Sequence, residues 1–218
     1  MNLMQHAVSL FALLPEAIRP EVILGGGCLR AHFDGTEIKD IDCFFRSRED
    51  FLKVADILDD EPGWERADSP NGVINFTAPS GHLVSLIGFE FGDALDHADR
   101  FDFRCCAHVA AYVSPTLAAV LSLPGAEDDA RGRLLYVLNN NGTERTVRRI
   151  QHYVEDYGYA LHPDQEVEPE QGDLFEDDGI GGHMSQGVRP EPARLPEPEY
   201  IVAARRRVRS LPVTTHGY

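Results

Sequence analysis

Two aspartates, Asp40 and Asp42, stand one residue apart in the mostly apolar segment KDIDCFF at positions 39–45. Successive side chains of a β-strand point to opposite faces, so these two carboxylates would lie side by side on one face. Like charges at that distance repel each other, and a largely hydrophobic strand bears this cost best with a cation between them. Proteins commonly hold Mg²⁺ through one or two carboxylates together with substrate phosphates. The pair therefore predicts a metal site, with a solvated or salt-bridged pair as the ordinary alternative.

Three consecutive glycines, Gly25, Gly26 and Gly27, separate an upstream apolar run from a short helix-like segment. Glycine lets the backbone approach a ligand closely, and the N-terminus of a helix directs free N–H groups and a positive dipole end at it. A triphosphate is the ligand that such a turn and two carboxylate-bound cations would hold together. The glycines alone would also suit an ordinary turn, but their combination with the aspartates favours a phosphate and metal site.

The segments around these residues predict an α/β (or α+β) fold, a small mixed sheet with flanking helices. Apolar runs predict strands at 21–26, 38–45, 72–79, 82–91 and 101–113, the third and fourth joined as a hairpin. Helical spacing predicts helices at 28–33, 47–60, 114–123 and 144–159, and a turn or short helix at 92–100. Ser47 and Asp50 resemble a capping box at the start of the 47–60 helix. The first 22 residues predict an amphipathic helix rather than a signal peptide.

The charge of the chain is unevenly distributed along its 218 residues, which are 43% hydrophobic and carry a net charge of −16. Residues 1–160 hold 25 acids and 14 bases and suffice for one domain with a core. Residues 161–199 hold 11 acids and 2 bases among many Pro and Gly residues, which predicts a disordered acidic linker. Residues 200–218 hold four arginines and no acid. This basic segment is a helix or an extended peptide, either a solvated tail or a contact for nucleic acid, a partner or the acidic linker.

The four cysteines (Cys28, Cys43, Cys105 and Cys106) lie in apolar or glycine-rich surroundings, which predicts buried, reduced thiols in a cytoplasmic protein. No apolar run reaches the roughly 18 residues that a membrane span needs, so no membrane partner is expected. The acidic head disfavours tight, sequence-blind binding to a phosphate backbone, although a locally basic cleft remains compatible with it.

The stretch from Gly26 to Asp42 resembles the head of the polymerase β-type nucleotidyltransferases, in particular bacterial CCA-adding tRNA nucleotidyltransferases and poly(A) polymerases. Their signature runs G-G-x-x-R-D, a short helix, a glycine and K-D-I-D. Eight residues match it without a gap: Gly26, Gly27, Arg30, Gly35, Lys39, Asp40, Ile41 and Asp42. Ala31 replaces the acid after the arginine. The resemblance covers roughly residues 20–160, so it implies a nucleotidyltransferase head with a partial neck helix at 1–160, without the body that holds tRNA.

A second motif of that family, R-R-D-F-T-x-N-A, is similar to RFDFRCCA at positions 100–107. By resemblance, Arg100 contacts the triphosphate and Asp102 helps to place the nucleotide. The second arginine, the threonine and the asparagine of the motif are replaced here by Phe101, Arg104 and Cys106.

Two further family features match only in part. The segment 146–161 resembles the neck helix whose arginines face the incoming nucleotide; Arg149 fits it, and His152 stands where an arginine is usual. The third catalytic acid of the family falls on the 82–91 strand, where the nearest match is Ser85. Asp102 or Glu90 would then complete the metal site, and Asp102 has the better motif support. The base-reading motif E-D-x-x-R is absent.

The resemblance implies a nucleotidyltransferase that moves NMP from an NTP, ATP included, to an acceptor hydroxyl and releases pyrophosphate. Two Mg²⁺ ions would bridge Asp40, Asp42 and the phosphates. The implied catalytic residues are Asp40, Asp42 and Asp102. The implied nucleotide-binding residues are Gly26, Gly27, Arg30, Lys39, Arg100 and Arg149. The acceptor stays open between an RNA 3′ end, a protein side chain and a small molecule.

Two other interpretations remain open at this point. The first is a degenerate head that binds a nucleotide or a partner without catalysis, which Ser85, Phe101 and Cys106 would suit. The second is an interaction adaptor whose working part is the RRRVR segment. Retention of both Asp40 and Asp42 favours activity, because a strand without a bound metal would be expected to lose such a repulsive pair.

Overall fold

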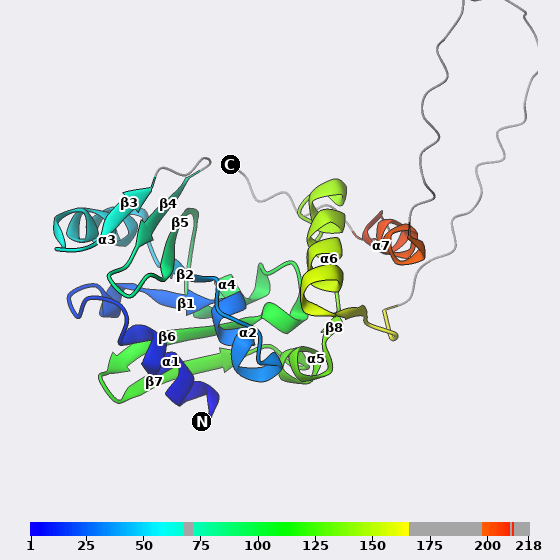
Figure 1. Ribbon diagram of the computed structural model, residues 1–218, viewed down its shortest axis with the longest axis horizontal. Coiled ribbons are helices and arrows are strands. Elements are labelled where there is room, and N and C mark those ends of the chain that lie inside the picture. The colour runs from blue at the N-terminus through cyan, green and yellow to red at the C-terminus, as the bar shows by residue number, and fades with distance from the viewer. Residues whose placement is uncertain (68–71, 166–197, 210, 212–218) are drawn as a thin grey trace, which may run out of the picture.

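The structure, a computed structural model, describes residues 1–67, 72–165, 198–209 and 211. Its body is a seven-stranded sheet with the strand order β3-β4-β5-β2-β1-β6-β7 (Figure 1). Strands β2 and β5 are parallel, and the other neighbours are antiparallel. The strands span Ile23–Gly25 (β1), Asp40–Phe45 (β2), Glu65–Ala67 (β3), Val73–Thr77 (β4), Leu83–Phe91 (β5), His108–Ser114 (β6) and Leu117–Ser122 (β7). The predicted α/β class with a mixed sheet is confirmed.

Helices flank the sheet, and a short parallel pair of strands, Leu134–Leu135 (β8) and Ala160–Leu161 (β9), lies apart from it. The helices span Leu3–Phe11 (α1), Gly27–Asp34 (α2), Arg48–Asp60 (α3), Ala94–Asp99 (α4), Ala126–Gly132 (α5), Thr143–Tyr157 (α6) and Glu199–Arg209 (α7). Two 3₁₀ turns lie at Arg19–Glu21 and Arg104–Cys106. The Ser47 hydroxyl accepts the Asp50 N–H at the start of α3, so the predicted helix start is confirmed.

The main core lies between one face of the sheet and helices α1, α2 and α3. The side chains of β2 alternate, and Ile41, Cys43 and Phe45 are all fully buried in this core. The same alternation directs Asp40 and Asp42 to the opposite face of the sheet. Burial of apolar surface stabilises the protein by about 25 cal/mol per Å². The strand is therefore held in the register that buries these three side chains and places both carboxylates on the other face of the sheet.

A second core joins the segment after α4 to helices α6 and α7. Figure 1 shows α7 packed beside α6. Ile201, Ala204 and Val208 of α7 are buried, and the Tyr200 hydroxyl donates a 2.6 Å hydrogen bond to Glu155 on α6. Residues 199–209 are thus helical and packed on their own chain, so the alternative of a solvated tail is wrong for them.

Three predicted elements differ from the structure. Residues 114–123, predicted as a helix from their alanines and leucines, form strand β7, because the turn at Pro115 and Thr116 folds them back onto β6. The strand predicted at 101–113 begins only at His108. The amphipathic helix at the N-terminus ends at Phe11 rather than near residue 22.

All four cysteines are free and buried, as predicted. No helix in the described part of the chain has the length and apolar character to cross a bilayer. The predicted acidic linker at 161–199 falls mostly outside the described residues. Its first residues continue the fold, since Gln165 exchanges two 2.9 Å hydrogen bonds with the main chain of Val137.

Candidate functional site

The glycine turn connects β1 to α2 in the way the sequence predicts. Strand β1 ends at Gly25 and helix α2 begins at Gly27, with Gly26 between them at a φ of 73°. A Cβ atom at Gly25 would lie 2.9 Å from the ring of Phe101, and one at Gly26 would lie 3.1 Å from it. Gly25 and Gly26 are therefore needed for close packing and a positive φ, whereas Gly27 has open space above it.

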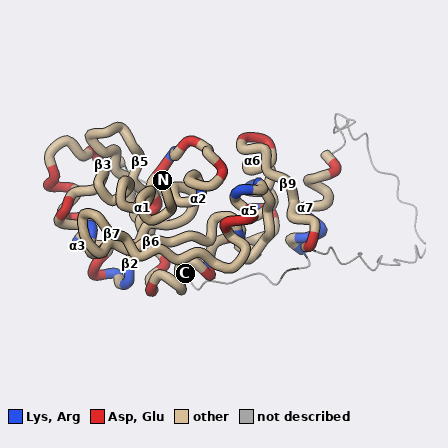
Figure 2. Tube along the Cα trace, turned by 90° about the horizontal axis from the view of Figure 1, so that it is seen from below, with Lys and Arg blue, Asp and Glu red and all other residues tan. Residues whose placement is uncertain are grey.

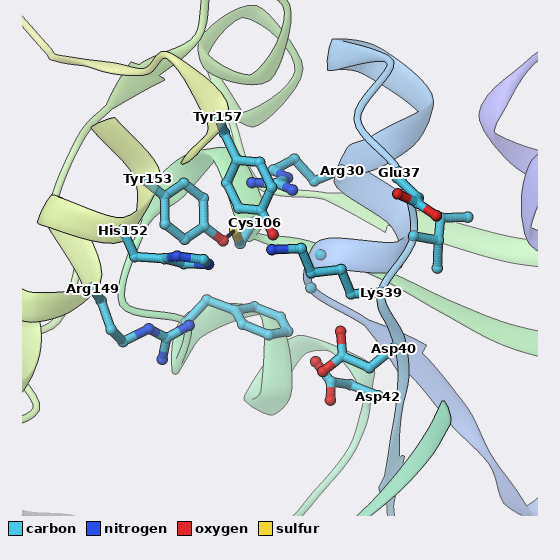
Figure 3. A pocket seen from close by; sticks show the side chains of 14 residues that line it. Arg30, Glu37, Lys39, Asp40, Asp42, Cys106, Arg149, His152, Tyr153 and Tyr157 are labelled. Atoms are coloured by element: carbon cyan, nitrogen blue, oxygen red, sulfur yellow. Dashed lines mark hydrogen bonds between the residues drawn. The ribbon is translucent and has the colours of Figure 1, made fainter. Parts of the chain in front are cut away.

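The two aspartates lie next to this turn. Asp42 is paired in register with Gly25 on β1 and with Ser85 on β5. Figure 3 shows the carboxylates of Asp40 and Asp42 side by side and directed into a hollow. Removal of the Asp42 carboxyl from water, followed by the nearby charge of Asp40, raises the pKa of Asp42. The pair thus carries the electrostatic cost that a bound cation would relieve.

The hollow in front of the aspartates has a volume of ≈ 230 Å³. Helix α6 forms its opposite wall through Arg149, Tyr153 and Tyr157, which recur every four residues and therefore share one face of the helix. Lys39 reaches across the opening, and its Nζ atom lies 4.9 Å from the centroid of the Tyr157 ring. Figure 3 shows Arg149, Tyr153 and Tyr157 on the side of the hollow opposite the aspartates, and Lys39 extending toward them from the side of Asp40.

Arg30 lies deep in the same hollow and is only 2% exposed. Its guanidinium lies 4.7 Å from the centroid of the Tyr157 ring and 4.8 Å from that of Tyr153. Its Nε atom is 3.2 Å from a carboxylate oxygen of Asp34. The Nη1 atom is buried and has no hydrogen-bond partner among the described residues. Arg30 thus keeps a free donor for a ligand, although Asp34 balances its charge.

Cys106 lines the hollow, at the position where the family has an asparagine. Its Sγ atom lies 3.0 Å from the Tyr153 hydroxyl. The neighbouring Cys105 thiol, then the charge of Arg30, the Tyr153 hydroxyl and Arg149, lower the pKa of Cys106 against the opposing effect of its burial. Cys106 and Tyr153 are thus held by contact with each other while both line the hollow.

Asp102 lies beyond Phe101, in a neighbouring hollow of ≈ 260 Å³. Its buried carboxylate forms an ion pair with Arg149 and accepts a hydrogen bond from the Asn141 amide. Arg100 lines the same neighbouring hollow and donates a 3.1 Å hydrogen bond to the main-chain oxygen of Phe91. Asp102 therefore holds Arg149 in place but does not share a hollow with Asp40.

The donor set fits one divalent cation better than two. Asp40 and Asp42 supply adjacent carboxylates, and with substrate phosphates they suit Mg²⁺. The third position, beside Asp42 on β5, holds the hydroxyl of Ser85 instead of a carboxylate. Among the described residues, no group of three or more His, Cys, Asp or Glu side chains is arranged to hold a metal ion. Glu90, the other candidate for the third acid, lines the neighbouring hollow.

The structure brings most of the predicted site residues together. The first hollow gathers Gly26, Gly27, Arg30, Lys39, Asp40, Asp42 and Arg149. Arg100 and Asp102 line only the second hollow. Sequence reasoning did not single out Tyr153 and Tyr157, although their four-residue spacing from Arg149 was a readable signal. The roles of all these residues remain predictions.

The sheet, with its glycine turn and aspartate pair, is similar in fold to part of the CCA-adding tRNA nucleotidyltransferases, so the predicted resemblance is confirmed for the fold. The chain matches an apo CCA-adding enzyme with a TM-score of 0.56 at 15% identity, covering 72% of this chain and 39% of that chain. It matches a tRNA nucleotidyltransferase complexed with a primer tRNA and an incoming ATP analog with a TM-score of 0.52 at 14% identity (66% and 44% coverage). At these identities the likeness concerns the fold, and this chain spans less than half of those proteins.

The chain belongs to the Gad2 family, the Gabija anti-defense 2 family proteins, whose family model matches residues 5–116. That range contains the glycine turn, both aspartates and the 100–107 segment. The Thermotoga maritima CCA-adding enzyme complexed with tRNA is also similar in fold, with a TM-score of 0.50 at 13% identity over 75% of this chain and 44% of that chain. No curated protein sequence matches the chain significantly.

Proposed function

We propose that this chain is a divalent-cation-dependent nucleotidyltransferase that moves NMP from an NTP to an acceptor hydroxyl. The observation that carries the proposal is the side-by-side placement of Asp40 and Asp42 against a glycine turn, facing Arg149 across one hollow. Burial and the charge of Asp40 raise the pKa of Asp42, so the ionised pair is unfavourable on its own and is stabilised by a bound cation.

In the proposed reaction the acceptor oxygen forms a bond to the α-phosphorus. The bond from that phosphorus to the bridging oxygen breaks, pyrophosphate leaves with the electron pair, and the proton of the acceptor hydroxyl passes to water. Asp40 and Asp42 would hold the cation, which supplies charge neutralisation and activation of the attacking oxygen when bound. The backbone at Gly26 and Gly27 lets the phosphates approach, and Arg149 and Lys39 add positive charge beside them.

The family's description as anti-defense gives this activity a setting. The transfer would serve to counter the Gabija defense, either by marking a component of it or by making a product that acts on it. The complexes of the structural neighbours with tRNA and with an ATP analog favour NTP as donor and keep RNA among the acceptors. The cytoplasmic location remains a prediction.

A second function, binding of a nucleotide without transfer, is favoured by one observation. Ser85 occupies the register position beside Asp42 where a third acid would stand, so the site offers fewer carboxylates than two cations need. The adaptor interpretation loses support, because α7 packs its apolar side onto α6 rather than presenting the arginine segment alone.

The proposal is tested by incubating the full chain with Mg²⁺ and each α-labelled NTP, in the presence of total RNA and of cell lysate. The Asp40→Ala/Asp42→Ala double variant runs in parallel. Label transferred by the wild type and absent with the variant supports the nucleotidyltransferase. Without transfer, an NTP-dependent rise in melting temperature that the double variant loses would instead support nucleotide binding alone.

A further inference from the structure

The second hollow lies directly beside the first. Its volume of ≈ 260 Å³ is close to the ≈ 230 Å³ of the first. Asp42, Phe101 and Arg149 line both, so the two hollows share a wall. One carboxylate of the candidate site thus borders two cavities of similar size, and the proposed function uses only the first.

The second hollow has an apolar floor. Phe44, Val73 and Ile87 lie there on the same face of the sheet as Asp42. Phe89 also lines the hollow, and 39% of it is exposed. An exposed aromatic ring beside an apolar floor suits a planar ring system, because every nucleobase has a face that stacks on such groups.

Two arginines of this hollow have no acidic partner among the residues that the structure describes. Within the described ranges, neither Arg100 nor Arg145 takes part in an ion pair, and Arg100 donates only to the main chain of Phe91. Arg145 is exposed and precedes Arg149 by four residues, so both extend from one side of α6. Guanidinium groups without a carboxylate partner favour an anion, and their fork of donors matches phosphate.

The surroundings disfavour a long nucleic acid at this place. Glu90 lines the hollow, and α4, which contributes Arg100 at its end, exposes Asp93, Asp96 and Asp99. A phosphate backbone that continued over α4 would meet these carboxylates. Figure 2 shows red acidic segments at many places along the body, in line with the net charge of −16. The hollow is therefore suited to one nucleotide rather than to a strand.

We propose that the second hollow binds a nucleotide as the acceptor, so that the chain joins two nucleotides. This inference rests on the proposed function, in which the donor NTP occupies the first hollow. A ribose hydroxyl of the acceptor forms a bond to the α-phosphorus of the donor. The bond to the bridging oxygen breaks, pyrophosphate leaves, and the hydroxyl proton passes to water. The product is a dinucleotide, and Asp42 lies on the wall where the two reacting groups meet.

The first test counts bound nucleotides. The full chain is titrated in a calorimeter with Mg²⁺ and an NTP analogue that carries a non-cleavable bridge between the α- and β-phosphates, for each of the four bases. The wild type is expected to bind two nucleotides, and a Phe89→Ala/Arg145→Ala variant only one. A Leu95→Ala/Arg148→Ala variant is the matched control, because both residues are exposed and line neither hollow. It should still bind two.

The second test follows the product. The chain is given α-labelled NTP without nucleic acid or another protein, and a labelled dinucleotide with an equal amount of pyrophosphate is expected. The Phe89→Ala/Arg145→Ala variant should form it at least about tenfold more slowly, the loss that removal of a base-stacking contact brings.

Two results would overturn the inference and leave the proposed function intact. One is a single nucleotide bound per wild-type chain. The other is label that appears only on added RNA or protein and is not reduced by Phe89→Ala/Arg145→Ala. A wild-type chain that binds no nucleotide at all would instead contradict the proposed function itself, so the two failures are distinguishable.

Discussion

The two walls of the first hollow differ in how their polar side chains are satisfied. On the sheet side, Asp40 and Asp42 lie side by side. Among the described residues, neither forms an ion pair with a cationic side chain. On the helix side, polar groups are engaged by other side chains of the protein. Arg149 pairs with Asp102, and Cys106 contacts the Tyr153 hydroxyl. In the 3₁₀ turn that carries Cys106, Arg104 pairs with Asp129 behind the lining residues.

This difference separates two kinds of order. The helix-side wall is stabilised by its own contacts, whereas the sheet-side wall carries a repulsion between two carboxylates that a bound cation would relieve. The same division appears in the sequence resemblance. Eight residues from Gly26 to Asp42 match the nucleotidyltransferase signature, whereas Phe101, Arg104 and Cys106 replace residues of the second motif. The wall that would hold phosphate and metal keeps the nucleotidyltransferase pattern except at Ala31 and Ser85, whereas the wall that would face the base departs from it at Phe101, Arg104 and Cys106.

Substitution of Asp42 is expected to have the largest effect on function and a small one on folding. Asp42→Asn keeps the shape of the side chain but removes half of the carboxylate pair. Nucleotidyl transfer should fall about 1,000-fold or more, since metal-assisted charge stabilisation supplies several kcal/mol. The free energy of unfolding in urea should stay equal or rise, because a repulsion is removed.

The matched control is Asp60→Asn, an exposed carboxylate at the end of α3. It should leave transfer unchanged. Transfer by Asp42→Asn above a tenth of the wild-type rate would show that the sheet-side wall is not the ligand-ready one.

Substitution of Asp129 should show the opposite pattern. Its carboxylate accepts hydrogen bonds of 2.7 and 2.9 Å from Arg104, and His162 lies 3.3 Å from it. Asp129→Asn leaves the Arg104 charge without its partner, which should lower the free energy of unfolding by about 3 kcal/mol. Exposed Asp128→Asn on the same helix is the control and should change it by less than about 0.5 kcal/mol. Equal effects of the two variants would show that the turn carrying Cys106 is not stabilised by the ion pair of Arg104 with Asp129.

The sheet-side wall was predictable from the sequence because its geometry is local. The alternation of a strand places Asp40 and Asp42 on one face, and the register follows from which side chains must be buried. The helix-side wall was not predictable in the same way. The ion pair of Arg104 with Asp129 joins residues 25 positions apart, and the contact of Cys106 with Tyr153 joins residues 47 apart. No sequence period reports such pairings.

The same limit explains the error at residues 114–123. Alanine and leucine favour a helix locally, but pairing with β6 decides the outcome. The position of Asp102 shows that the same limit applies to the candidate site. Its motif placed it near the nucleotide, whereas it lines the second hollow with Asp42 and Phe101 and does not share a hollow with Asp40.

The pH dependence of the free energy of unfolding should include a contribution from His108, the first residue of β6. Burial, followed by the nearby His32 and Arg30, lowers the pKa of His108 to about 4. The unfolded chain titrates this group near 6.5 and so binds more protons between these values. The free energy of unfolding should therefore fall as the pH drops from about 6.5 to 4, by about 1 kcal/mol per pH unit from this residue.

Urea unfolding of the wild type and of His108→Gln at several pH values measures this contribution as a difference in slope. The comparison of slopes remains valid even where the variant is less stable at every pH. His82→Gln, on the loop before β5, is the control and should keep the wild-type slope. An unchanged slope in His108→Gln would refute a neutral, buried histidine at this place.

Ser85 offers the smallest but most direct test of the contrast, because it lies beside Asp42 on the same face of the sheet yet departs from the nucleotidyltransferase pattern. Ser85→Asp would place a third carboxylate in register with Asp42. Without metal, the added repulsion should lower the melting temperature. With Mn²⁺, the affinity read from the signal of free ions in electron paramagnetic resonance should rise about tenfold, since an added carboxylate ligand lowers the free energy of binding by about 1.4 kcal/mol.

Ser85→Ala is the control for loss of the hydroxyl and should leave Mn²⁺ affinity unchanged within about twofold. A rise in affinity confined to Ser85→Asp would mean that the sheet-side wall still has the geometry for a second cation and lacks only the ligand. Equal affinities in wild type and Ser85→Asp would mean that the helix-side wall has altered the aspartate pair as well. The two walls would then have changed together, and the contrast between them would no longer hold.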